Sequence, residues 1–117
     1  MNAEIIAKTD NLPYEEWLEL RKNGIGGSDA AAACGISRYK SPVELWMEKT
    51  DKMTPSEVGE STYWGTLLEG IVRDEFTKRT GIEVKSEKVL LRSAEHPFVL
   101  ANLDGICTDP NYGECIF

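Results

Sequence analysis

The chain has 117 residues, of which 41% are hydrophobic and 28% charged, and its formal net charge is −7. This length supports one domain that buries roughly two-thirds of its unfolded surface, and the composition is that of a soluble globular protein. No apolar run reaches the roughly 18 residues that a membrane-spanning helix requires. The acidic balance argues against a protein that binds nucleic acid over its whole surface, but it allows a local basic site.

The N-terminus and the cysteines indicate a cytoplasmic protein. No basic segment followed by a long apolar one opens the chain, so no secretory signal is expected. Cys34, Cys107 and Cys115 have no C-x-x-C spacing and cannot all pair with one another. Reduced thiols are therefore expected, and a structural zinc or an iron–sulfur cluster is not.

Two short helices are predicted in the first third of the chain. Pro13 is typical of a helix start, and Asn23-Gly24 is typical of a helix end. A second, alanine-rich helix follows the turn at Gly26-Gly27, and Ser28 is its expected N-cap.

A capping box and a proline at residues 41–44 predict a third helix that runs to residue 49. Periodicity lapses over residues 51–60, where a loop or lid is expected. The central helix is predicted over residues 62–80, with Gly81 as its stop.

Strand patterns follow the last helix. Residues 83–91, 98–107 and 114–117 read as strands, and the turn residues at 108–113 predict that the last two form a hairpin. Helices followed by an antiparallel meander predict an α+β fold in a single domain over residues 1–117. Because the last strand is still forming at Phe117, we expect that a C-terminal part is missing.

Two acids stand out as candidate metal ligands. Helical spacing places Glu69 at the border of an apolar stripe, and Asp104 follows the apolar strand that begins near Phe98. A buried carboxylate needs a cation, a donor or a proton, and a divalent cation held by hard oxygens would satisfy both acids. The simpler alternatives are that Glu69 reaches solvent and that Asp104 initiates a turn before Gly105.

A candidate anion site lies between the first two helices. Arg21 is near the end of one helix, and the glycine-rich residues 24–28 lead into the next, so amides, a hydroxyl and a guanidinium occur within eight residues. These groups suit a phosphate, provided that the carboxylate of Asp29 turns away from it. The alternative is a capped helix–helix corner with a solvated arginine. Positive charge gathers in this window, at Arg21, Lys22, Arg38 and Lys40.

These patterns together resemble the YqaJ viral recombinase family, the lambda-exonuclease-like members of the PD-(D/E)XK nuclease superfamily. The resemblance covers nearly all of the chain in the expected order, and it implies a restriction-endonuclease-like core. The residues that carry it are WLELRKNGIGGSDAA at 17–31, GISRYKSP at 35–42, GTLLE at 65–69 and LDG at 103–105.

The resemblance implies roles for particular residues. Arg21 and Ser28 match the positions that hold the 5′-terminal phosphate, and Gly27 and Arg38 belong to the same predicted phosphate and DNA contacts. Asp104 matches the first acid of the D…(D/E)-x-K motif, a direct metal ligand, and Glu69 matches the helical acid beside it. Mg²⁺, or Mn²⁺ in its place, is the expected ion.

The last part of the family motif, E-x-K, is not complete in this chain. Glu114-Cys115-Ile116 supplies an acid, but Ile116 stands where the lysine belongs. The better alignment puts the E-x-K step just beyond Phe117. The catalytic lysine would then be absent, and the chain by itself is expected to be inactive.

The resulting hypothesis is that the chain is the N-terminal part of a phage- or prophage-type, metal-dependent 5′–3′ DNA exonuclease. This enzyme would serve recombination in the cytoplasm of a bacterial host. The resemblance implies linear double-stranded DNA ends as the substrate, with a single-strand-annealing protein and further copies of the chain as possible partners and no membrane. The alternatives are a non-catalytic DNA-end-binding or adaptor module of the same fold and a plain interaction domain with an acidic surface.

Overall fold

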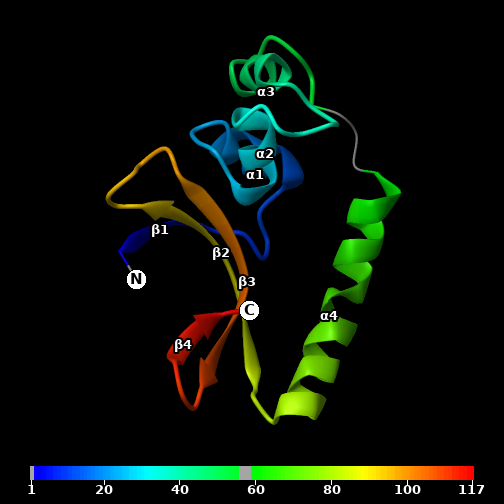
Figure 1. The fold of residues 1–117 in the computed structure, drawn as a ribbon, viewed down its shortest axis with the longest axis vertical. Coiled ribbons are helices and arrows are strands. Elements are labelled where there is room, and N and C mark those ends of the chain that lie inside the picture. Colours follow the sequence, from blue (N-terminus) through cyan, green and yellow to red (C-terminus); the bar gives the residue numbers. More distant parts are fainter. Residues whose placement is uncertain (1, 56–58) are drawn as a thin grey trace. The chain divides into compact units, whose positions relative to one another are not determined.

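The computed structural model describes residues 2–55 and 59–117, and its strands form a sheet in the order β1-β2-β3-β4 (Figure 1). Strand β1 is antiparallel to β2, and β3 is antiparallel to β4, so the predicted α+β class is confirmed. The elements are β1 (Ala3–Lys8), α1 (Tyr14–Arg21), α2 (Gly27–Ala33), α3 (Pro42–Lys49), α4 (Glu60–Thr80), β2 (Val84–Ser93), β3 (Leu100–Asp109) and β4 (Gly113–Ile116).

The chain forms two compact units, and each is described by itself. The first comprises Met1–Pro55 and Lys88–Leu103, and the second comprises Ser56–Glu87 and Asp104–Phe117. The unit boundaries thus fall inside β2 and β3. Arg21 and Ser28 belong to the first unit, and Glu69 and Asp104 belong to the second.

A backbone bridge holds the α1–α2 connection against the sheet in the first unit. The Ile25 amide donates to the Phe98 carbonyl at 2.7 Å, and the Leu100 amide donates to the Ile25 carbonyl at 2.9 Å. A Cβ on Gly24 would lie 2.5 Å from the Phe98 oxygen, so only glycine fits this close approach. The buried apolar residues of this unit are Ala32, Leu45, Val89, Leu90, Leu91, Leu100 and Leu103.

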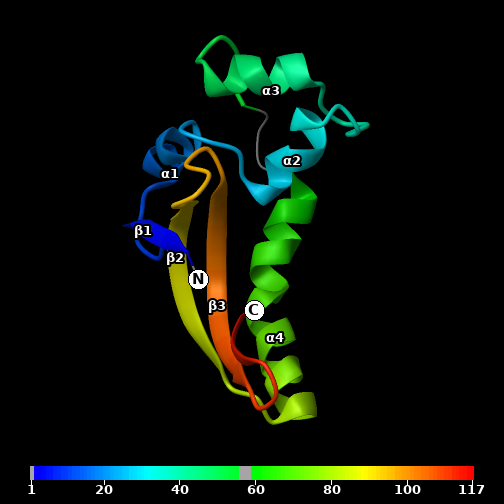
Figure 2. The ribbon, with the colours of Figure 1, turned by 60° about the vertical axis from the view of Figure 1, so that its left-hand side comes forward.

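Strand β1 is an element that the sequence did not predict. It pairs with β2 from Ala3 opposite Ser93 to Lys8 opposite Val89, with an irregularity between Ile5 and Ala7 (Figure 2). The strand has six residues and is mostly exposed. Because long-range backbone pairing stabilises it, its own short sequence carries little signal.

Several local predictions are confirmed. Ser41 caps α3, since its Oγ accepts from the Glu44 amide at 3.1 Å. Gly81 ends α4 in the left-handed conformation, with a φ of 73°. Strands β3 and β4 form the predicted hairpin, and the carboxylate of Asp109 accepts from the amides of Asn111 and Tyr112 in its turn.

Helix α4 buries less than its apolar pattern suggests. None of its 21 residues is buried, and the side chains of Leu67, Leu68, Ile71 and Val72 are exposed. The helix is about 31 Å long, whereas the four residues of β4 span about 13 Å, so the strands of this unit cover only part of it. Its packing is clearest where the Phe76 and Phe117 rings lie 5.1 Å apart.

Two predictions concern the remaining segments. The expected loop or lid over residues 51–60 is non-helical at residues 51–55, while residues 56–58 lie outside the described part of the chain. Among the described helices, none combines the length and the apolarity that crossing a bilayer requires.

Candidate functional site

Arg21 and Ser28 meet at the junction of α1 and α2. The Nη2 group of Arg21 donates to Ser28 Oγ at 2.8 Å and to Asp29 Oδ2 at 3.2 Å. The guanidinium carbon also lies 4.7 Å from the centre of the Trp17 ring, within the range of a cation–π interaction. The predicted N-cap role of Ser28 is wrong, because α2 begins at Gly27, two residues earlier than expected, and its N-cap is Gly26. The hydroxyl is used by Arg21 instead.

Asp29 is the buried centre of this cluster. Only 8% of its surface is exposed, and its Oδ2 accepts from the Gly26 amide at 3.0 Å, from Arg21 and from Lys49 Nζ at 2.8 Å. Lys49 also donates to the Arg21 carbonyl at 2.7 Å. The Asp29 charge is therefore directed inward and paired, and the two cations leave the cluster with a net positive charge.

Burial by itself would raise the pKa of Asp29. The hydrogen bonds from Lys49 and Gly26 and the charges of Arg21 and Lys49 outweigh that effect and hold the pKa below its ordinary value of 3.8. A carboxyl whose pKa is depressed by folding stabilises the protein above its unfolded pKa and loses that contribution as the pH falls through its folded pKa.

Asp29→Asn should therefore destabilise the protein in a pH-dependent way. At pH 7 we expect a loss of about 3 kcal/mol in the free energy of unfolding, because two cations lose their partner in a buried site. The difference from the wild type should shrink as the pH falls below about 4, because Asp29 of the unfolded chain then takes up a proton before Asp29 of the folded chain does. Denaturant unfolding from pH 7 to pH 3 measures this, and a difference that stays constant would contradict it.

The start of α2 forms one side of the predicted anion site. Helix α2 has only seven residues, and the Gly26 amide already donates to Asp29. Gly27 is exposed at the first position of the helix. Arg38 lies exposed in the loop after α2, with its guanidinium 6.0 Å from the Tyr39 ring centre.

Sequence reasoning missed the role of Lys49 in this cluster. Lys49 ends α3, and the Arg21 carbonyl that it contacts is 28 positions away in the chain. Only the contact between α2 and α3 brings them together. Trp17 is different, because it is one helical turn before Arg21 and that spacing predicts contact.

The two candidate metal ligands lie in the second unit. Glu69 is half-buried on α4, about two helical turns before Phe76 and on the same side of the helix. Asp104 is exposed, so the expectation that it points into the interior is wrong. Successive residues of β3 face opposite sides of the sheet, and the two neighbours of Asp104, Leu103 and Gly105, are buried. Both residues interact with other groups of the protein.

The register of the hairpin decides which acids share a face with Asp104. Ile106 is opposite Ile116, and the Phe117 amide donates to the Gly105 carbonyl at 2.9 Å. Glu114 is opposite Thr108, on the same face as Asp104 but four residues further along the strand. That separation is roughly 13 Å, too far for one ion to join Glu114 and Asp104. Within residues 2–55 and 59–117, no group of three or more His, Cys, Asp or Glu side chains could hold a metal ion.

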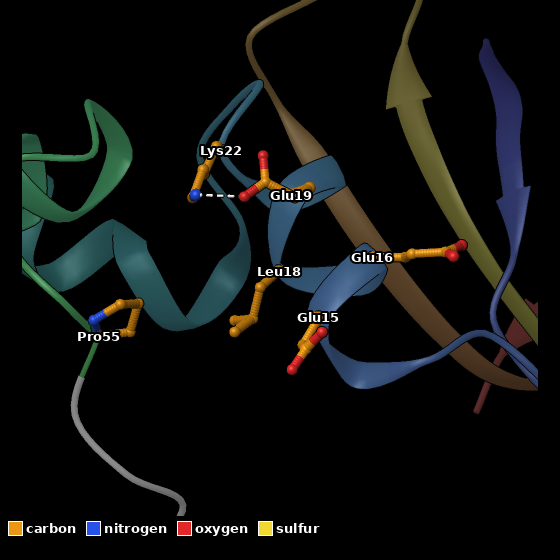
Figure 3. A pocket seen from close by; sticks show the side chains of 6 residues that line it. All are labelled: Glu15, Glu16, Leu18, Glu19, Lys22 and Pro55. Atoms are coloured by element: carbon orange, nitrogen blue, oxygen red, sulfur yellow. Dashed lines mark hydrogen bonds and ion pairs between the residues drawn. The ribbon is translucent and has the colours of Figure 1, made fainter.

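A pocket of about 440 Å³ beside α1 is distinct from the Arg21 cluster. It is lined by Glu15, Glu16, Leu18, Glu19, Lys22 and Pro55 (Figure 3). Leu18 points from α1 toward Pro55, and Lys22 is paired with Glu19 at 2.5 Å and with Asp51. The acidic wall and the paired lysine make this pocket unsuitable for a phosphate.

Sequence comparison relates the chain to known proteins. The model of the YqaJ-like viral recombinase domain matches residues 16–117. A Bacillus subtilis (strain 168) protein described as "Uncharacterized protein YqaJ" is 46% identical over 103 residues, which are 87% of this chain and 32% of the relative. A protein of African swine fever virus (strain Badajoz 1971 Vero-adapted) is 32% identical over 60 residues, which are 51% of this chain and 17% of that protein.

The chain thus spans about a third of the length of the Bacillus relative and a smaller part of the viral one. The family match includes Arg21, Ser28, Glu69 and Asp104, and it extends through both units. The chain belongs to the family of YqaJ-like viral recombinase domains.

Proposed function

We propose that the chain is the N-terminal part of a metal-dependent 5′–3′ DNA exonuclease that acts in phage-type recombination and has a restriction-endonuclease-like core. The observation that carries this proposal is the Arg21 guanidinium beside the Ser28 hydroxyl, held by a buried carboxylate, in a domain of the viral recombinase family. Its substrate is a linear double-stranded DNA end.

Arg21 and Ser28 are proposed to bind the 5′-terminal phosphate. The Nη2 group of Arg21 is used within the protein, but a guanidinium has five N–H groups, so those on Nη1 can still donate to a phosphate oxygen. A terminal phosphate carries a charge of about −1.5 to −2, more than a diester within the strand. The site would therefore select ends and set the direction of digestion.

Asp104 and Glu69 are proposed to hold the divalent ion. Their donors are carboxylate oxygens, and neither residue is buried, which suits Mg²⁺ or Mn²⁺, ions that bind one or two carboxylates and keep several waters. When bound, such an ion supplies Lewis-acid stabilisation of the scissile phosphate and a water that is readily deprotonated. The protein's own contribution is to place both carboxylates and to hold the 5′ end.

The hairpin register supports an E-x-K step beyond Phe117. A strand that continued in this register would put its next residue opposite Asp104 on the same face, where cross-strand Cβ atoms are about 5 Å apart. The lysine two positions later would share that face. Since Glu114 is too distant and Ile116 is apolar, residues 1–117 are proposed to bind DNA ends without cutting them.

Digestion of matched DNA substrates tests the proposal. The full gene product with Mg²⁺ should degrade a 5′-phosphorylated linear duplex and spare a closed circle of the same sequence, and EDTA should stop the reaction. A folded full gene product that binds linear ends but never shortens them would overturn the nuclease assignment in favour of a non-catalytic end-binding module.

A further inference from the structure

We propose that Asp29 and Lys49 are positioning residues that fix the Arg21 guanidinium for the terminal phosphate, so that the preference for phosphorylated ends depends on them. This inference rests on the proposed function, in which Arg21 and Ser28 take that phosphate. Neither Asp29 nor Lys49 is proposed to touch the DNA.

The guanidinium of Arg21 is constrained from several sides. The Trp17 ring lies 4.7 Å from the guanidinium carbon, while Ser28 Oγ and Asp29 Oδ2 both accept from Nη2. The backbone of Gly26 approaches as well, since a Cβ added there would lie 3.3 Å from Nη2 and 3.9 Å from Nε. An arginine held in this way has fewer rotamers to lose when a phosphate binds, which favours binding.

Lys49 fixes the carboxylate that fixes Arg21. Its Nζ donates to Asp29 Oδ2 at 2.8 Å and to the Arg21 carbonyl at 2.7 Å, and its side chain is 16% exposed. Asp29 therefore joins the end of α1, the start of α2 and the end of α3 through one oxygen. Lys49 also balances the Asp29 charge, so that the positive charge of Arg21 remains available to an anion.

Three substitutions separate this positioning role from the phosphate contact itself. Asp29→Asn keeps the size and an acceptor but removes the charge, and Lys49→Met keeps the length but removes the donors. Gly26→Ala leaves every charge in place and forces the guanidinium to move by a few tenths of an ångström. Glu48→Gln is the matched control, because it breaks a partly buried ion pair on the same helix, with Lys40 at 2.6 Å.

Fluorescence anisotropy measures the dissociation constants of the full gene product for a 5′-hydroxyl duplex and for a 5′-phosphoryl duplex, both without divalent ions. The quantity compared between variants is the ratio of the first constant to the second. Each of the three substitutions should lower this ratio by about fivefold, the difference between a charge-assisted and a neutral hydrogen bond. Lys49→Arg should restore part of it, and Glu48→Gln should leave it at the wild-type value. A general loss of DNA affinity cancels in the ratio.

The outcomes distinguish this inference from the proposed function. A wild type with no preference for phosphorylated ends would overturn the phosphate site itself. Arg21→Gln could remove the preference for phosphorylated ends while Lys49→Met and Gly26→Ala leave it intact. That result would overturn the positioning role alone, and it can be obtained even if Asp29→Asn fails to fold. An equal drop in Glu48→Gln would also overturn it, since the effect would then be one of general stability.

Discussion

Asp104→Asn in the full gene product should reduce Mg²⁺-dependent digestion of linear duplex DNA by at least about 100-fold. Loss of a partner that merely orients a metal ligand typically costs 10–100-fold, and a direct ligand should cost more. Asparagine keeps the size of the side chain, and Asp104 is exposed, so little destabilisation is expected. The measurement is the initial rate of nucleotide release from an end-labelled duplex.

Glu114→Gln is the matched control for Asp104. It removes a carboxylate from the same face of the β3–β4 hairpin, opposite Thr108 and roughly 13 Å along the strand. This variant should digest DNA at close to the wild-type rate. If Asp104→Asn digests DNA at a rate within a few-fold of the wild type, Asp104 is not a metal ligand. If Glu114→Gln loses as much digestion rate as Asp104→Asn, the effect comes from the negative charge of this face in general.

Arg21→Gln should abolish the preference for 5′-phosphorylated over 5′-hydroxyl ends. Hydrogen bonds to a charged group contribute about 1.5–3 kcal/mol each, which corresponds to at least a tenfold change in the ratio of digestion rates. Glutamine cannot supply the charge or the paired N–H groups of the guanidinium. Competition between the two labelled duplexes in one reaction measures the ratio directly.

Lys22→Gln serves as the control for Arg21. Lys22 is the adjacent cation, but its ammonium is paired with Glu19 and Asp51 beside an acidic pocket. Its loss should lower DNA affinity slightly for both ends and leave their ratio unchanged. If Arg21→Gln also leaves the ratio unchanged, Arg21 does not hold the terminal phosphate.

Local signals in the sequence predicted much of the fold. The Ser41 cap, the left-handed Gly81 and the turn before Gly113 each depend on residues a few positions apart, and all three occur in the structure. Strand β1 was missed because its partner residues, Val89–Ser93, lie about 80 to 90 positions away in the sequence. The exposed face of α4 was also missed, because periodicity indicates which residues share a face but not what covers it.

The candidate site was predicted only where its residues lie close together in the sequence. Arg21 and Ser28 lie close in sequence, and the structure joins them by a 2.8 Å hydrogen bond. Lys49 was missed because the contact between α2 and α3 brings it to Asp29 from far along the chain. The prediction that Asp104 is buried failed because the apolar run before it was taken as a whole, whereas alternation along a strand sends neighbouring side chains to opposite faces.

Glu69 and Asp104 are proposed to share one divalent ion. Titration of Mn²⁺ into the full gene product, followed by electron paramagnetic resonance of the free ion, tests this without any DNA cleavage. If the two carboxylates share an ion, Glu69→Gln and Asp104→Asn should each weaken the same tightest site, and the double variant should weaken it little further. Mn²⁺ binding that neither substitution changes would contradict the account.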